Sequence, residues 1–222
     1  MKIHKKGFNM IKIFLGVFLA LSVFSGNVYA LSAQDVLQNM RRADERVRTK
    51  EINFRQVTDY IFTRERQETT GTLRYRRPNL VSIHQHTPEQ YVYIDGRNIT
   101  IYTPAHRQAV IDRWQNVMAA NSLPALLINF SQNLQTLTEN NTVTLEEPNE
   151  RNHILKIVPN DPRENFTLRL FVSKETYFPT LAVMQSNAVS VNVQITSYRL
   201  NPNIAASEFR FRARPGVDII QL

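Results

Sequence analysis

The stretch from Gly71 to Pro104 reads GTLRYRRPNLVSIHQHTPEQYVYIDGRNITIYTP, and it decides the fold. Apolar and polar residues alternate along it in short runs, which predicts three or four consecutive antiparallel strands. Asp95-Gly96 between two such runs indicates a hairpin, because glycine supplies the positive φ that a tight turn requires. Arg77 precedes Pro78, and the proline ring holds its predecessor extended. We therefore expect the Arg77 guanidinium at a fixed place on a sheet with one apolar face.

The residues on both sides continue the β pattern and add two helical segments. Ser32 followed by Asp35 predicts a helix start with a near capping box. Asn116 to Glu139 departs from the β pattern and predicts a second helical segment, with Pro124 in its first turn. Further strands are predicted at 52–62, 106–114, 142–146, 153–158, 166–172, 180–185, 189–198 and 209–212.

These elements predict a mainly β protein of the α+β class. About eleven antiparallel strands would form an unclosed, strongly curved sheet or half-barrel that helices cover. Helices that cover the concave face only loosely would leave a hydrophobic cavity. One apolar helical face can therefore be either part of the core or a lid over the cavity; it comprises Leu126, Leu127, Phe130, Leu134 and Leu137.

The first 30 residues have the pattern of a secretory leader. Four lysines precede a short apolar run from Ile13 to Phe24, and Val28-Tyr29-Ala30 offers small residues to a signal peptidase. We predict cleavage after Ala30, export to the periplasm, and a single domain over residues 31–222.

The charge and the composition exclude several function classes. Four of the 27 basic residues and none of the 19 acidic ones lie in the leader, which leaves a net charge of about +4 and does not support nucleic-acid binding. The chain has no cysteine, so disulfides and thiolate metal sites are excluded.

Signatures of catalysis are missing from the sequence. His84 and His86 lie two apart on one strand face, but no cluster of acidic residues with ligand spacing accompanies them, which favours ordinary surface histidines. There is no Gly-x-Ser-x-Gly elbow, no phosphate loop and no His-Glu-x-x-His motif. The sequence predicts a protein that is not an enzyme and that has no cofactor and no metal site.

The chain after the leader carries a set of short motifs. They are Gly71-x-Leu73, Arg77-Pro78-Asn79-Leu80, Pro88, Asp95-Gly96, Tyr102-x-Pro104, Phe209-x-Phe211 and Pro215-Gly216-Val217. In a secreted, cysteine-free chain these motifs resemble the outer-membrane lipoprotein carrier protein family, LolA, and the resemblance covers essentially all of the chain after the leader. The resemblance implies an unclosed β-barrel with an α-helical lid, which shields the acyl chains of lipoproteins in the periplasm.

The resemblance also implies a site. Arg77 matches the arginine that locks the family's lid, and the run from Pro124 to Ile128 matches the lid helix. Val81, Ile83 and Val92 match cavity positions, although bulky aromatics are common at the first two. With their apolar neighbours, the predicted acyl-chain site comprises Leu73, Tyr75, Val81, Ile83, Val92, Ile94, Leu126, Leu127, Ile128 and Phe130.

The implied partners are acylated lipoproteins, an inner-membrane lipoprotein-releasing ABC transporter and an outer-membrane acceptor such as a LolB-like lipoprotein. We expect a monomer. Two other interpretations stay open: a periplasmic carrier of another amphiphile, such as a glycolipid or a polyketide-type lipid, and a regulatory lipoprotein-sensing module of the same architecture. The regulatory proteins carry a second C-terminal domain, which we do not expect in a chain of 222 residues.

Overall fold

The computed structural model describes residues 31–114 and 138–222, and residues 31–222 form one compact unit. The described elements, in chain order, are α1 (Ala33–Glu45), β1 (Thr49–Tyr60), β2 (Arg66–Arg76), β3 (Leu80–His86), β4 (Glu89–Asp95), β5 (Asn98–Thr103), the 3-10 helix η1 (Pro104–His106), β6 (Gln108–Arg113), β7 (Asn141–Glu146), β8 (Asn152–Pro159), β9 (Phe166–Ser173), β10 (Pro179–Ser186), β11 (Val189–Leu200), the 3-10 helix η2 (Ala206–Phe209) and β12 (Asp218–Gln221).

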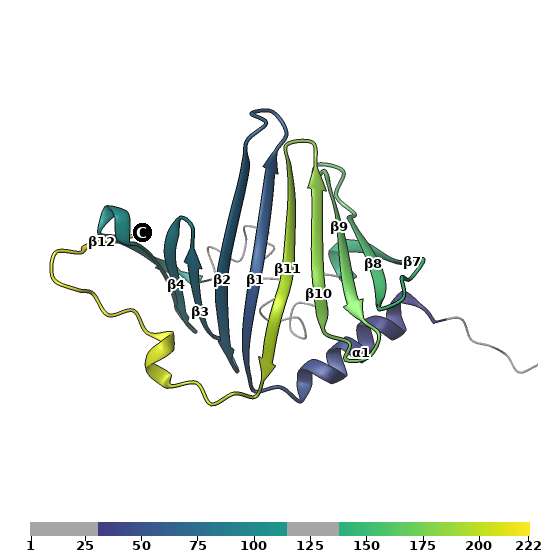
Figure 1. The fold of residues 1–222 in the computed structure, drawn as a ribbon, viewed down its shortest axis with the longest axis horizontal. Helices are drawn as coiled ribbons and strands as arrows, with labels where there is room; N and C mark the ends of the chain where they lie inside the picture. Colours follow the sequence, from purple (N-terminus) through teal and green to yellow (C-terminus); the bar gives the residue numbers. More distant parts are fainter. Residues whose placement is uncertain (1–30, 115–137) are drawn as a thin grey trace, which may run out of the picture. The chain divides into compact units, whose positions relative to one another are not determined.

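The described strands form one sheet, whose order is β12-β6-β5-β4-β3-β2-β1-β11-β10-β9-β8-β7 (Figure 1). Neighbouring strands are antiparallel except for β12, which pairs with β6 in parallel. The mainly β class is thus confirmed. The sheet is nevertheless mixed and has 12 strands, so the prediction of about eleven strands, all antiparallel, was wrong in this detail.

The sheet is unclosed, as predicted, but the prediction of strong curvature was wrong, because the sheet is not strongly curled. Curling into a barrel requires a staggered register, bulges and pairing of the two edges. Among the described strand pairs, register shifts occur at two places, Asn53/Phe54 and Pro179/Leu181. In addition, β12 extends the β6 edge outward, so the two edges of the sheet remain β12 and β7.

The stretch from Gly71 to Pro104 folds as its alternation predicts. It supplies the end of β2, all of β3 and β4, and β5, each paired with the next strand. Asp95 accepts hydrogen bonds on Oδ1 from the backbone N–H groups of Arg97 and Asn98, at 2.9 and 2.8 Å. Gly96 has a φ of 94°, so the glycine occupies the left-handed conformation that the hairpin needs.

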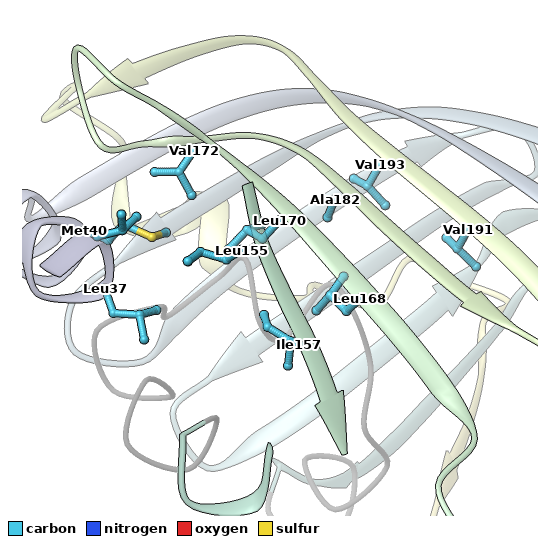
Figure 2. Close-up of a cluster of buried hydrophobic side chains, with 11 residues drawn as sticks. Leu37, Met40, Leu155, Ile157, Leu168, Leu170, Val172, Ala182, Val191 and Val193 are labelled. Carbon is cyan, nitrogen blue, oxygen red and sulfur yellow. The ribbon is translucent and has the colours of Figure 1, made fainter. Parts of the chain in front are cut away.

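Helix α1 begins with the expected cap. The Ser32 hydroxyl accepts a hydrogen bond from the Asp35 N–H, and the Asp35 carboxylate accepts one from the Ser32 N–H, which completes a capping box. The apolar side of the helix packs on the half of the sheet from β8 to β11 (Figure 2). The buried members of this first cluster are Val36, Leu37, Met40, Leu155, Ile157, Leu168, Leu170, Val172, Ala182, Val191 and Val193.

A second apolar cluster covers the same face of the sheet on its other half. Pairing of Ile52 with both Leu73 and Tyr198 places these side chains on one face, and Phe54 packs against both clusters. The buried members of this second cluster are Ile52, Leu73, Tyr75, Val81, Ile94 and Ile99. One sheet face is therefore apolar along its breadth, and it divides into two cores near β1.

The segment after β11 passes the ends of β2, β3 and β4 on its way to β12 (Figure 1), and its aromatic side chains pack on the face opposite the two clusters. The predicted strand at residues 209–212 was wrong: Phe209 ends η2, and no strand is formed there. Phe209 is buried beneath the Arg76 guanidinium, and the Phe211 ring packs against Tyr93 and Tyr102. These rings lie over β2, β4 and β5, which already have neighbours on both sides, so no free strand edge is available for pairing.

Candidate functional site

The second cluster contains every predicted site residue that the structure describes, except Arg77. Leu73 and Tyr75 come from β2, Val81 and Ile83 from β3, and Val92 and Ile94 from β4. Direct cross-strand pairing joins Leu73 to Ile83, Tyr75 to Val81, Ile83 to Val92, and Val81 to Ile94. Four of the six are buried, and Ile83 and Val92 are partly buried. Because alternate side chains of a strand lie on the same face of the sheet, these six residues form one continuous apolar surface.

The cluster is larger than the sequence analysis predicted. Ile52 and Ile99 are buried within it, and further apolar side chains pack around it. The alternation of Ile99 and Ile101 in β5 was a signal that could have found two of these residues. The partly buried members are Phe54, Ile83, Val92, Ile101, Trp114, Phe178, Ile195 and Tyr198.

Arg77 follows β2 and reaches the C-terminal end of α1. Its Nε donates to the Val47 carbonyl at 2.7 Å, and its Nη2 donates to the Asp44 carbonyl at 2.8 Å. The same Nη2 lies 3.4 Å from the Asp44 carboxylate. Carbonyls at a helix end lack partners within the helix and carry partial negative charge, so a guanidinium is well matched to them. Arg77 therefore ties the end of a helix to the edge of the apolar face.

The predicted lid residues Leu126, Leu127, Ile128 and Phe130 lie outside the described residues. Within the described part of the chain, the helix end that Arg77 binds belongs to α1.

A buried lysine, which the sequence analysis missed, lies beside this contact. Lys50 Nζ donates to Asp44 Oδ1 and lies 5.2 Å from the centre of the Tyr75 ring. Burial lowers the pKa of Lys50, and the nearby Asp44 carboxylate only partly opposes this effect. Burial likewise raises the pKa of Tyr75 to about 12. The position of Lys50 two residues before Ile52, on the same strand face, was the available signal.

A small cavity of about 30 Å³ opens between α1 and the segment that precedes β10. Asp44 and Lys50 are its charged lining residues, and Met40, Val47 and Phe178 are among its apolar residues. Met40 belongs to the first cluster and Phe178 packs on the second, so the cavity marks the boundary between the two cores. This space is large enough to hold ordered water.

The opposite face of β3 and β4 carries polar and aromatic side chains. The His84 ring stacks on Tyr91 at 4.2 Å and meets the His86 ring at 4.5 Å. Glu89 accepts a hydrogen bond from the Tyr91 hydroxyl and lies 3.4 Å from His84 Nε2, and these contacts lower the pKa of its carboxyl. Within residues 31–114 and 138–222, no group of three or more potential metal ligands occurs. In the same ranges, no helix has the length and apolarity needed to cross a membrane.

An open sheet with one apolar face, and a helix tied to the edge of that face, suits a protein that shields apolar ligands from water. The family model for the outer membrane lipoprotein carrier protein LolA matches residues 45–212. The chain belongs to this family, whose members are periplasmic lipoprotein carriers and not enzymes.

Curated relatives are similar in sequence to this chain over nearly its full length. The outer-membrane lipoprotein carrier protein of Pseudomonas putida is 27% identical over 216 residues, which cover 91% of this chain and 94% of the relative. The protein of the same name from Pseudomonas syringae pv. tomato is 27% identical over 214 residues, covering 96% and 99%.

Two solved structures share the fold. An uncharacterized conserved protein from Thermus thermophilus gives a TM-score of 0.57 at 11% identity, covering 86% of this chain and 99% of that one. The crystal structure of MucB gives a TM-score of 0.52 at 16% identity, covering 82% of this chain and 63% of MucB. At these identities, the similarity shows the fold alone.

Proposed function

We propose that the chain carries lipoproteins by holding their acyl chains against the second apolar cluster. The carrier unit in this proposal is a single domain of residues 31–222, released by cleavage after Ala30. The supporting observation is that six predicted strand residues share one apolar surface, at whose edge Arg77 binds a helix end.

The energetics of an acyl chain favour this kind of surface. Each methylene group withdrawn from water contributes about 0.8 kcal/mol, so two or three exposed acyl chains would be costly to move through an aqueous compartment. Aliphatic side chains such as Leu73, Val81 and Ile94 impose no directional bonds, and they suit cargo that varies in protein sequence but always presents hydrocarbon.

The closing element must be weak enough to open. We propose that Arg77 serves as a latch on α1 and that the segment from Pro124 to Ile128 forms the remainder of the lid. Each hydrogen bond to the guanidinium contributes about 1.5–3 kcal/mol, which cargo binding can offset. In this scheme an inner-membrane ABC transporter loads the carrier, and an outer-membrane acceptor with a LolB-like role receives the lipoprotein.

The first experiment identifies the bound molecule. The protein is purified without detergent from the periplasm of its own cells and analysed by native mass spectrometry. A diacylglyceryl-modified peptide or a whole lipoprotein supports the proposal. A free glycolipid would instead assign the chain to another amphiphile, and a protein that is empty and fails to bind a hydrophobic dye would refute the acyl-chain site.

The second experiment locates the site with two adjacent residues of β3. Ile83 belongs to the apolar cluster, whereas His84 lies on the opposite face. Ile83→Ser should weaken binding of a fluorescent diacylated lipopeptide about tenfold, since it removes a large apolar side chain from the contact surface. His84→Ser is the matched control, and equal affinities of the two variants would argue against the proposed surface.

A further inference from the structure

The turn between β1 and β2 exposes three consecutive large side chains. Tyr60, Ile61 and Phe62 are 41%, 52% and 80% exposed. Soluble proteins often expose single apolar residues, but a contiguous group usually marks a contact surface. Figure 1 shows this turn beside the turn between β10 and β11. Since β1 begins opposite Arg76 and ends at Tyr60, the tip lies at the other end of the strand from the Arg77 latch.

Backbone hydrogen bonds hold this tip in place. The Tyr60 N–H donates to the Glu65 carbonyl and the Arg64 N–H donates to the Tyr60 carbonyl, both at 2.9 Å. The Ile61 N–H donates to the Ala188 carbonyl of the neighbouring turn, also at 2.9 Å. The three side chains are therefore presented by a fixed support, and binding through them needs little further ordering of the backbone.

The charges around the tip balance. Asp59 and Glu65 oppose Arg64 and Arg66, and Arg66 Nη1 lies 3.4 Å from Asp59 Oδ1. A charge-balanced tip has little long-range attraction for either an anionic or a cationic partner. Its affinity must come from the apolar side chains themselves.

We propose that this tip, formed by Tyr60, Ile61 and Phe62, inserts into the interfacial region of a lipid bilayer. A stable protein partner would bury roughly 800 Å² on each side, far more than three side chains on a convex turn can offer. A bilayer needs no complementary pocket, and aromatic residues favour the level of its headgroups. The tip would bring the carrier itself to the membrane surface, a role separate from cargo binding in the second cluster.

The test uses cargo-free protein after removal of the leader, with vesicles of phosphatidylcholine alone or with added phosphatidylglycerol. Phe62→Ser should lower vesicle co-sedimentation about tenfold, because it removes the most exposed apolar side chain of the tip. Leu222→Ser is the matched control, since Leu222 is 79% exposed but lies beside β6 at the sheet edge. Unchanged thermal melting of both variants establishes that they fold.

A second measurement reports where the tip lies. Because the chain has no cysteine, Thr63→Cys and Leu222→Cys each accept one environment-sensitive dye. We expect the emission of the dye to shift to the blue on vesicle addition at position 63 only. The size of this shift should change less than about twofold with salt or phosphatidylglycerol. Equal vesicle binding by wild type and Phe62→Ser would overturn the proposal. So would a complete lack of binding, or binding that needs phosphatidylglycerol and disappears in salt. Lipopeptide binding is measured separately, so failure here leaves the carrier proposal standing.

Discussion

Asp44 and Lys50 form an ion pair that is almost completely withdrawn from solvent, with side chains 8% and 2% exposed. Asp44 lies near the end of α1 and Lys50 in β1, so the pair joins the helix to the middle of the sheet. Arg77 binds the same Asp44 from the β2–β3 connection. One carboxylate thus contacts two cations at the junction of three elements.

Asp44→Asn should destabilise the protein by about 3–5 kcal/mol, because it leaves Lys50 charged and buried without its counter-ion. Urea unfolding at neutral pH measures the loss. The double variant Asp44→Leu with Lys50→Met should recover most of it, since apolar side chains of similar size remove both charges. A double variant as unstable as Asp44→Asn would contradict this account.

The lowered pKa of Lys50 predicts a dependence of stability on pH. Between the folded-state pKa and the ordinary value of 10.5, the unfolded chain binds more protons than the folded chain, so stability rises with pH in this interval. Lys50→Met should abolish this rise. Measurements of the unfolding free energy at several pH values below 10 test this prediction. Lys156→Met, in β8, serves as the control.

The raised pKa of Tyr75 predicts that the stability of the protein falls as the pH rises further. The pKa of this tyrosine is 10.0 when exposed and about 12 in the folded protein, so the unfolded chain loses its proton first. The folded state is then destabilised by up to about 2–3 kcal/mol as the pH rises from 10 to 12. Tyr75→Phe should remove this alkaline loss, as seen by unfolding across that range. The ultraviolet titration of wild type should contain one late tyrosine that the variant lacks.

Arg77→Leu should still accept cargo but release it poorly, because the contact between β2 and the end of α1 no longer closes and opens as a latch. Transfer of a labelled lipoprotein to outer-membrane vesicles that contain the acceptor measures the defect. Arg97→Leu, in the exposed β4–β5 turn, is the control. Normal transfer by Arg77→Leu would refute the role assigned to Arg77.

Gly71→Ala should destabilise the protein by about 1–3 kcal/mol through overpacking. A Cβ at this position would lie 2.6 Å from the His84 carbonyl oxygen and 2.7 Å from the Phe54 ring. The carbonyl belongs to the paired strand β3 and cannot move away without breaking the ladder. Thermal melting compared with the exposed Thr70→Ala checks the prediction, and equal melting temperatures would contradict it.

Alternation of residue types predicted most of the strands and the shared face of the six apolar site residues, although the strand predicted at 209–212 was wrong and β12 was missed. Val81, Ile83, Val92 and Ile94 needed only a period of two and a short turn to meet on one face. The same local signals identified the α1 cap and the Asp95-Gly96 hairpin.

Features that depend on distant partners could not be predicted in this way. Strand β12 reads DIIQ and all its residues are exposed, so it carries no alternation, and only the free edge of β6 defines it. The partners of the buried Lys50 are Asp44 and the Tyr75 ring, which come from other elements of the chain. Sheet curvature depends on register shifts, which residue type alone does not encode.

The parallel pairing of β12 with β6 also makes one edge of the sheet late to form. Residues 108–113 and residues 218–221, with which they pair, lie about a hundred residues apart in the sequence, and contacts of such long range form slowly. Until β12 pairs, the outer row of β6 amides and carbonyls can serve as a template for another chain. The pairing of residues 218–221 therefore determines when this edge of the sheet stops being open to self-association.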